Sequence, residues 1–286
     1  MIKALLKENL VFLIVSFLAF SSTPALVQAQ ASDYTPVPFT ETLTLSRGSV
    51  SPPSPNSFYL GRDDYCEITQ SEWGWQSCAS IDAFLLGGAP GVDTAIIEKP
   101  VSDGYVTYDD WNDADRDEEI AAIETELALS MRSQSEATGQ DIHFLGWRAY
   151  PTLDQQKNYL YYATDIEWDG ERLINITATI FDRRGYVTFS IVPLSSELNE
   201  AQIAKMVDDT LAPYSPAPDE SYAAFETGDK IAAAGAVGVL ATLVGVKYGK
   251  TAFAGLAAIA LLVLKKAWFL LLFPLIWIKS FFQRKE

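Results

Sequence analysis

The chain has 286 residues, a formal net charge of −16, one histidine and two cysteines. The charge is unevenly divided: residues 32–227 hold 34 acidic and 11 basic side chains, whereas residues 228–286 hold 2 acidic and 8 basic ones. So acidic a domain repels phosphate backbones, which argues against nucleic acid as a partner. One histidine and two cysteines also make a poor ligand set for zinc.

The first 31 residues have the pattern of a signal peptide. Lys3 and Lys7 form a basic start, an apolar run follows at 10–20, and small residues then offer cleavage sites ending at Ala29 or Ala31. The run is short for a transmembrane span, which needs about 20 residues. An uncleaved N-terminal anchor is the alternative. We therefore expect residues 1–31 to direct export.

Export would place the two cysteines in an oxidising compartment. Cys66 and Cys78 are twelve residues apart, and a disulfide between them would contribute about 3 kcal/mol by restricting the unfolded chain. We predict that they pair. Free thiols, or a metal or redox role, are the alternatives.

Composition divides the region after the signal peptide. Residues 32–57 combine proline, serine and threonine, which predicts a linker with at most one strand. The folded domain is expected to begin at Phe58. Short apolar runs at 83–86 and 95–97 predict buried strands, and residues 104–111 predict a strand end that leads into an acidic helix start.

Two helices and four further strands follow from the hydrophobic period. Three- and four-residue spacing predicts one amphipathic helix from Asp113 or Asp115 to about Glu136, and another at 197–211. Alternation predicts strands at 142–147, 159–166, 174–181 and 186–192, the last two forming a hairpin. This order indicates an exported α+β domain at 58–212, with a mainly antiparallel sheet and two amphipathic helices.

The C-terminal region has the composition of a membrane anchor. Prolines predict a stalk at 213–230, and residues 231–286 are expected to form a membrane-anchoring helical tail. The apolar run 231–278 is longer than one bilayer crossing needs. Lys265 and Lys266 interrupt it, and each would cost about 2.5–3.5 kcal/mol at mid-bilayer, which makes them candidate interaction residues. We favour one crossing plus an embedded segment over a two-span hairpin, because one crossing leaves the basic C-terminus in the cytoplasm.

Four motifs in order give the chain a family resemblance. They are DGYVTYDDW (103–111), LGW followed by YPTLD (145–154), FDRRGYV (181–187) and GDKIAAAG (228–235). Together they resemble domain-of-unknown-function family 2167, from about residue 72 to the C-terminus. The resemblance implies a bacterial envelope protein and implies no activity, because the family has none assigned.

The candidate chemistry of the chain is sparse. His143 is flanked by Ile142 and Phe144 and has the pattern of an ordinary strand residue. Nucleophilic catalysis needs a nucleophile, a base and an orienting group, and the sequence has no Gly-x-Ser-x-Gly elbow, phosphate-binding loop or metalloprotease helix motif. We predict no catalytic residues, no cofactor and no resident metal.

Two charged clusters are speculative interaction sites. The first is the acidic run that contains Asp109, Asp110 and Asp113, where Asp113 and Glu124 have the spacing of the ends of a calcium loop. An acidic helix start is the favoured explanation, because Glu118 occupies the loop position that needs Gly and acids stabilise the first turn of a helix. The second is Arg183 and Arg184 at the hairpin tip, which could receive an anionic partner group; a solvated turn is the alternative.

These observations predict a membrane-anchored protein of the bacterial envelope, with its main domain on the periplasmic side. The acidic domain is expected to be a non-enzymatic binding or scaffolding module. Its partners would be the lipid bilayer and another envelope protein, not nucleic acid. A cation-responsive sensor or a carboxylate-dependent hydrolase is the alternative.

Overall fold

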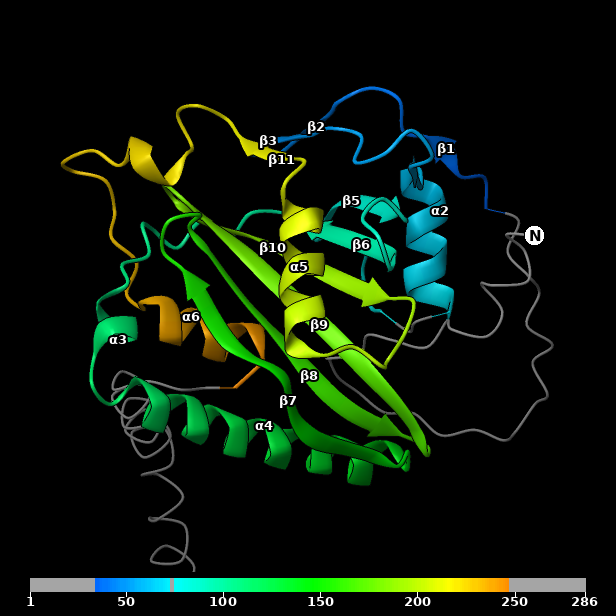
Figure 1. Cartoon of the computed structure of the whole chain (residues 1–286), viewed down its shortest axis with the longest axis vertical. Coiled ribbons are helices and arrows are strands. Elements are labelled where there is room, and N and C mark those ends of the chain that lie inside the picture. Colours follow the sequence, from blue (N-terminus) through cyan, green and yellow to red (C-terminus); the bar gives the residue numbers. More distant parts are fainter. Residues whose placement is uncertain (1–33, 73–74, 247–286) are drawn as a thin grey trace, which may run out of the picture. The chain divides into compact units, whose positions relative to one another are not determined.

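The computed structural model describes residues 34–72 and 75–246, which form one compact unit ending at Val246. The predicted signal peptide, Lys265, Lys266 and most of the predicted tail lie outside the described residues. Within them the predicted class is confirmed, because a mainly antiparallel sheet is accompanied by a few helices (Figure 1).

The main sheet has eight antiparallel strands. In spatial order they are β1 (Val37–Pro38), β4 (Phe58–Tyr59), β5 (Ile81–Leu86), β6 (Val92–Glu98), β10 (Gly185–Pro193), β9 (Glu171–Asp182), β8 (Tyr159–Trp168) and β7 (Ile142–Asp154). All of the strands predicted from alternation are present, and β7 is longer than predicted. The predicted hairpin is β9 with β10, in which Asp182 pairs with Gly185 across a two-residue turn.

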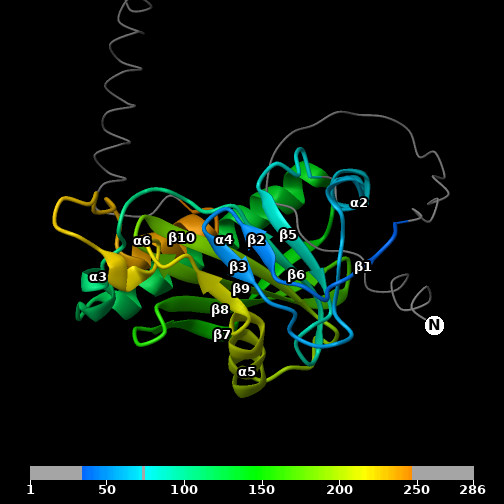
Figure 2. The same ribbon diagram turned by 90° about the horizontal axis from the view of Figure 1, so that it is seen from above.

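Alternation along the central strands gives the main sheet two distinct faces. On the first face, Ile176 and Ala178 of β9 and Phe189 of β10 join one core cluster. Helix α5 (Glu200–Leu211) covers this face with Ile203 and other apolar residues (Figure 2). Asn199 and Gln202 form a capping box at its start, which explains why the helix begins three residues after the predicted position.

Helices cover the second face of the sheet at two places. Helix α4 (Arg116–Thr138) packs along β7, and its predicted stripe is buried at Ile120, Ile123 and Leu127 (Figure 2). Helix α2 (Arg62–Glu67) and the π-helix η1 (Ile68–Glu72) cover the other end, over Phe84 and Ile96. The sheet therefore has α5 on its first face, and α4, α2 and η1 on its second face.

The predicted disulfide is present. Cys66 of α2 is bonded to Cys78, with 5.1 Å between the two Cα atoms. Cys78 is buried in the same cluster as Ile81 and Phe84, so the bond fixes α2 and the following loop against the second face.

The prediction of a linker at 32–57 is wrong. This region contains β1 and also β2 (Leu43–Leu45) and β3 (Gly48–Val50), which pair with β11 (Tyr214–Pro216) in a second, three-stranded sheet. Phe39 and Val50 are each only 1% exposed and belong to the main core. Proline- and serine-rich composition concealed these strands because each is only two or three residues long.

The prediction of a stalk at 213–230 is also wrong. Strand β11 lies in the second sheet, the 3-10 helix η2 (Tyr222–Ala224) follows, and Tyr214 and Glu220 are buried. The first part of the predicted tail is folded into the domain as well. Helix α6 (Ala236–Leu243) packs against α3 (Asp109–Asn112) and α4 (Figure 1). In residues 34–72 and 75–246 no helix is long and apolar enough to cross a membrane.

Arg47 lies in the region 32–57 that was predicted as a linker. Substituting this residue tests whether the region contributes to the stability of the domain. Its guanidinium is 2.6 Å from Asp182 in a buried ion pair, with side-chain exposures of 4% and 1%. Replacing Arg47 by Met should lower the free energy of unfolding by about 3–5 kcal/mol, because the carboxylate of Asp182 is left buried and unpaired. Urea denaturation measures the loss.

Two further variants control this prediction. Adding Asp182→Asn to the Arg47→Met variant should recover part of the loss, because it removes the unpaired charge. Arg116→Met breaks an exposed pair with Asp117 and should cost at most about 1 kcal/mol. Equal losses for Arg47→Met and Arg116→Met would show that residues 34–57 are not held by the buried pair.

The disulfide gives a second prediction. The double variant Cys66→Ser, Cys78→Ser should be about 3 kcal/mol less stable than the parent chain, because the unfolded chain is no longer cross-linked. A reductant should lower the stability of the parent chain by a similar amount and leave the double variant unchanged. A reductant effect on both proteins would contradict this assignment.

Candidate functional site

Three of the four sequence motifs meet at one end of the main sheet. We call this region the junction; it consists of residues 101–111, 181–187 and 220–238. Backbone hydrogen bonds join its parts: Tyr105 donates to Lys230 over 2.8 Å, Ala232 donates to Tyr105 over 2.9 Å, and Gly104 donates to Arg184 over 2.9 Å. The motifs are far apart in sequence, and they share one place in the fold.

Two glycines permit the close approach of these backbones. Gly104 has a φ of 117°, and a Cβ atom there would lie 2.7 Å from the Ala232 nitrogen and from the Lys230 oxygen. A Cβ atom on Gly185 would overlap the carbonyl oxygen of Val101. The glycines in DGYVTYDDW and FDRRGYV are therefore needed for packing between the motifs.

Both arginines of the hairpin tip are paired within the chain. Arg183 binds Asp229 through two hydrogen bonds, of 2.7 and 2.9 Å, and its Nη2 is 3.2 Å from Glu226. Arg184 binds Glu220 in the same two-pronged manner. The chain's own 220–229 segment therefore supplies the carboxylates that both arginines bind.

The pair Arg47–Asp182 lies beneath this turn. Asp182 also accepts a hydrogen bond from the backbone of Arg184 over 2.8 Å, and Arg47 donates to the Val101 carbonyl and to the Ser102 hydroxyl. Burial raises the pKa of Asp182, and the adjacent Arg47 guanidinium opposes this rise. Sequence reasoning missed this pair, because its members are 135 positions apart.

The three candidate aspartates have different roles. Asp110 accepts hydrogen bonds from the backbone nitrogens of Val237, over 3.1 Å, and of Gly238, over 3.3 Å, and so caps the start of α6. Burial raises the pKa of Asp110, and these two hydrogen bonds oppose the rise. Asp109 is exposed, and Asp113 ends α3.

The spacing that resembles a calcium loop is not realised as a loop. Helix α4 begins at Arg116, so Glu124 lies within a helix and cannot fold back toward Asp113 as a loop ligand does. The favoured explanation, an acidic helix start, agrees with the three acids in the first turn of α4. Among the described residues, no group of three or more His, Cys, Asp or Glu side chains could hold a metal ion.

A row of aromatic rings completes the junction. The Tyr105 ring lies between Phe225 and Tyr222, with centroid distances of 4.2 and 4.3 Å, and Tyr108 stacks on Tyr222 at 5.1 Å. The Tyr222 hydroxyl donates to the Val106 carbonyl over 2.7 Å. Burial raises the pKa of Tyr222 far above its usual range. Sequence analysis missed this row, although two of its tyrosines lie in DGYVTYDDW.

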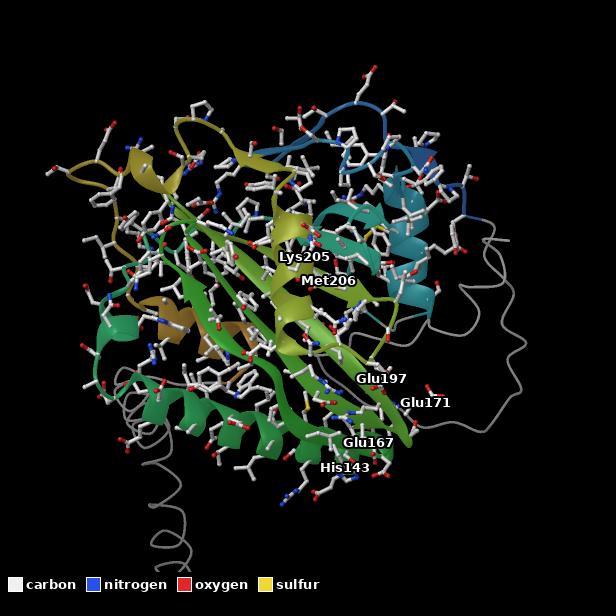
Figure 3. All side chains as sticks on the ribbon, viewed as in Figure 1. His143, Glu167, Glu171, Glu197, Lys205 and Met206 are labelled. Atoms are coloured by element: carbon white, nitrogen blue, oxygen red, sulfur yellow. A yellow bond between two sulfur atoms is a disulfide. The ribbon has the colours of Figure 1, made fainter. Side chains whose placement is uncertain are left out.

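His143 lies at the opposite end of the sheet from the junction. It is on β7 beside Glu167 of β8, and its exposed imidazole is 2.8 Å from Asp141 (Figure 3). This placement fits an ordinary strand histidine.

Fold and junction together define an acidic α+β domain in which the motifs DGYVTYDDW and FDRRGYV bind the chain's own segment 220–238. The chain belongs to the DUF2167 family: the model of this family, described as a protein of unknown function, matches residues 42–276. The match confirms the resemblance and begins further toward the N-terminus than the motifs indicated.

Two other comparisons add little. None of the curated proteins matches the chain. Among solved structures, the chain is similar to the solution structure of cyanobacterial PsbP (CyanoP) from Synechocystis sp. PCC 6803, with 11% identity and a TM-score of 0.28. The similarity covers 50% of this chain and 78% of that chain. A TM-score this low supports no structural or functional argument.

The pair Arg183–Asp229 predicts a pH dependence. The Arg183 guanidinium lowers the pKa of Asp229 below its ordinary value of 3.8. The contribution of the pair is therefore complete above that value and is lost as the pH falls through the lowered pKa. The stabilities of the parent chain and of Asp229→Asn should differ at pH 7 and converge in acid.

Unfolding free energies measured along the acid branch check this expectation. Glu171→Gln, which lies at the far end of β9 and outside the junction, serves as the control. A difference between the parent chain and Asp229→Asn that is the same at every pH would contradict an ionic role for the pair.

Proposed function

We propose that this chain is a membrane-anchored protein of the bacterial envelope whose acidic exported domain is a binding or scaffolding module. The observation that carries this proposal is the use of the motif residues. Arg183, Arg184 and Asp110 bind the chain's own segment 220–238, which leads directly into the apolar tail. This use of the motif residues supports a role in which they hold the segment that precedes the proposed anchor.

Charge supports a role in binding. The 34 acidic side chains of residues 32–227 outnumber the 11 basic ones threefold, and several of the basic ones are already paired within the fold. The accessible surface therefore carries a large excess of negative charge, which favours a partner with basic residues and speeds association with it. Anionic lipid headgroups would be repelled, so the bilayer contact is assigned to the tail.

Site-specific photo-crosslinking in native membranes tests the proposal. Leu145 on β7 and Leu194 after β10 are good positions for the photoreactive residue, because they are 49% and 50% exposed and lie on different elements. We expect at least one position to give a covalent adduct with the same envelope protein in repeated preparations, identified by mass spectrometry.

The full-length chain without the photoreactive residue, irradiated in the same membranes, is the control. The adduct should be absent from it, and a soluble excess of the domain should compete for the partner. Recovery of the free monomer alone from both positions would overturn the scaffolding role.

A further inference from the structure

Residues 231–246 combine two properties that usually exclude each other. All 16 residues are uncharged and the segment is rich in Ala, Val, Gly and Leu, which is the composition of a membrane-embedded segment. In the described fold the same segment packs onto an acidic domain, and Ala236, Val237, Val239, Leu240 and Ala241 of α6 are all buried.

A helix that is apolar on every side is suited to a protein interior and to a bilayer alike. Its side chains therefore do not choose strongly between the two environments, because lipid tails are as apolar as a protein core. The choice depends on the ends of the helix, where backbone N–H groups lack partners within the helix.

In the docked state these N–H groups receive partners from the first motif. The Asp110 carboxylate accepts from Val237 and Gly238, and the Thr107 carbonyl accepts from Ala236 over 3.2 Å. Gly235 is required beside them, since a Cβ atom there would overlap the Asp110 carboxylate. A single side chain thus supplies much of the capping that holds α6 to the domain.

The same contact carries a cost. Asp110 Oδ1 is buried and has no hydrogen-bond partner in the described part of the chain, so the carboxylate is only partly compensated for its loss of water. The Asp110 carboxylate caps α6 but is incompletely hydrogen-bonded in the docked state. Its contact with α6 is therefore suited to breaking and re-forming.

We propose that residues 231–246 are a reversible membrane-binding segment, docked on the domain through Asp110 and able to leave it for the lipid bilayer. Release would extend the apolar tail by 16 residues, about 24 Å of helix. This inference rests on the proposed membrane anchoring and adds that the domain controls how much of the tail enters the lipid.

The test follows one probe on α6 in the full chain reconstituted in phosphatidylcholine liposomes. Thr242 is exposed in the docked state, and Thr242→Cys provides a specific thiol because both native cysteines are bonded to each other. It is labelled with the environment-sensitive dye NBD. In the otherwise unchanged chain the probe should stay in water, with weak emission that spin-labelled lipids do not quench.

Asp110→Ala removes the cap and should raise the emission severalfold, with quenching by spin-labelled lipids. Asp109→Ala is the matched control, because the Asp109 carboxylate is next in sequence and exposed; this variant should leave the probe in water. Gly235→Ala disrupts the same contact from the α6 side without removing a polar group. It tests the release of α6 if Asp110→Ala fails to fold.

The outcomes separate this inference from the proposed function. Chains that fold and float with the liposomes, yet keep the probe in water in both Asp110→Ala and Gly235→Ala, would overturn the inference alone. A probe already in lipid without either substitution would overturn it too, because α6 would not be docked. A chain that does not float with liposomes would contradict the anchoring and the inference together.

Discussion

The buried ion pair between Arg47 and Asp182 is the interaction on which the junction depends. Each residue lies in the turn of a hairpin, Arg47 between β2 and β3 and Asp182 at the start of the turn between β9 and β10. A charge at this depth is tolerated only with a close partner, so the two turns must meet. The pair therefore fixes the second sheet against the main sheet.

Other contacts of the junction build on this constraint. Arg47 also donates to the Val101 carbonyl, which places the 101–111 segment beside the turn between β9 and β10. Arg183 and Arg184, in that turn, bind the 220–229 segment. The most buried pair, Arg47–Asp182, sets the position of the backbone. The more exposed pairs of Arg183 and Arg184 each contribute less to stability and add specificity for the 220–229 segment.

The sequence predicted what depends on local periodicity. Alternation located the hairpin of β9 and β10, and the stripe of Ile120, Ile123 and Leu127 located α4, because both patterns repeat over many residues. Strands of two or three residues carry no such period, which is why β1, β2 and β3 were assigned to a linker. The candidate residues Asp110, Arg183 and Arg184 were found from composition, but their partners are 36 to 128 positions away and leave no local signal.

The start of the predicted tail, residues 231–246, was misassigned for the same reason: its partners in the fold are distant in sequence. Hydropathy reports that a segment avoids water; it does not report whether lipid or protein replaces the water. In the described fold protein replaces the water around much of residues 231–246, and the start of α6 is capped by Asp110, a residue more than a hundred positions earlier in the sequence, with room made by Gly235. Any partner that displaced the 101–111 segment would remove the Asp110 cap from α6.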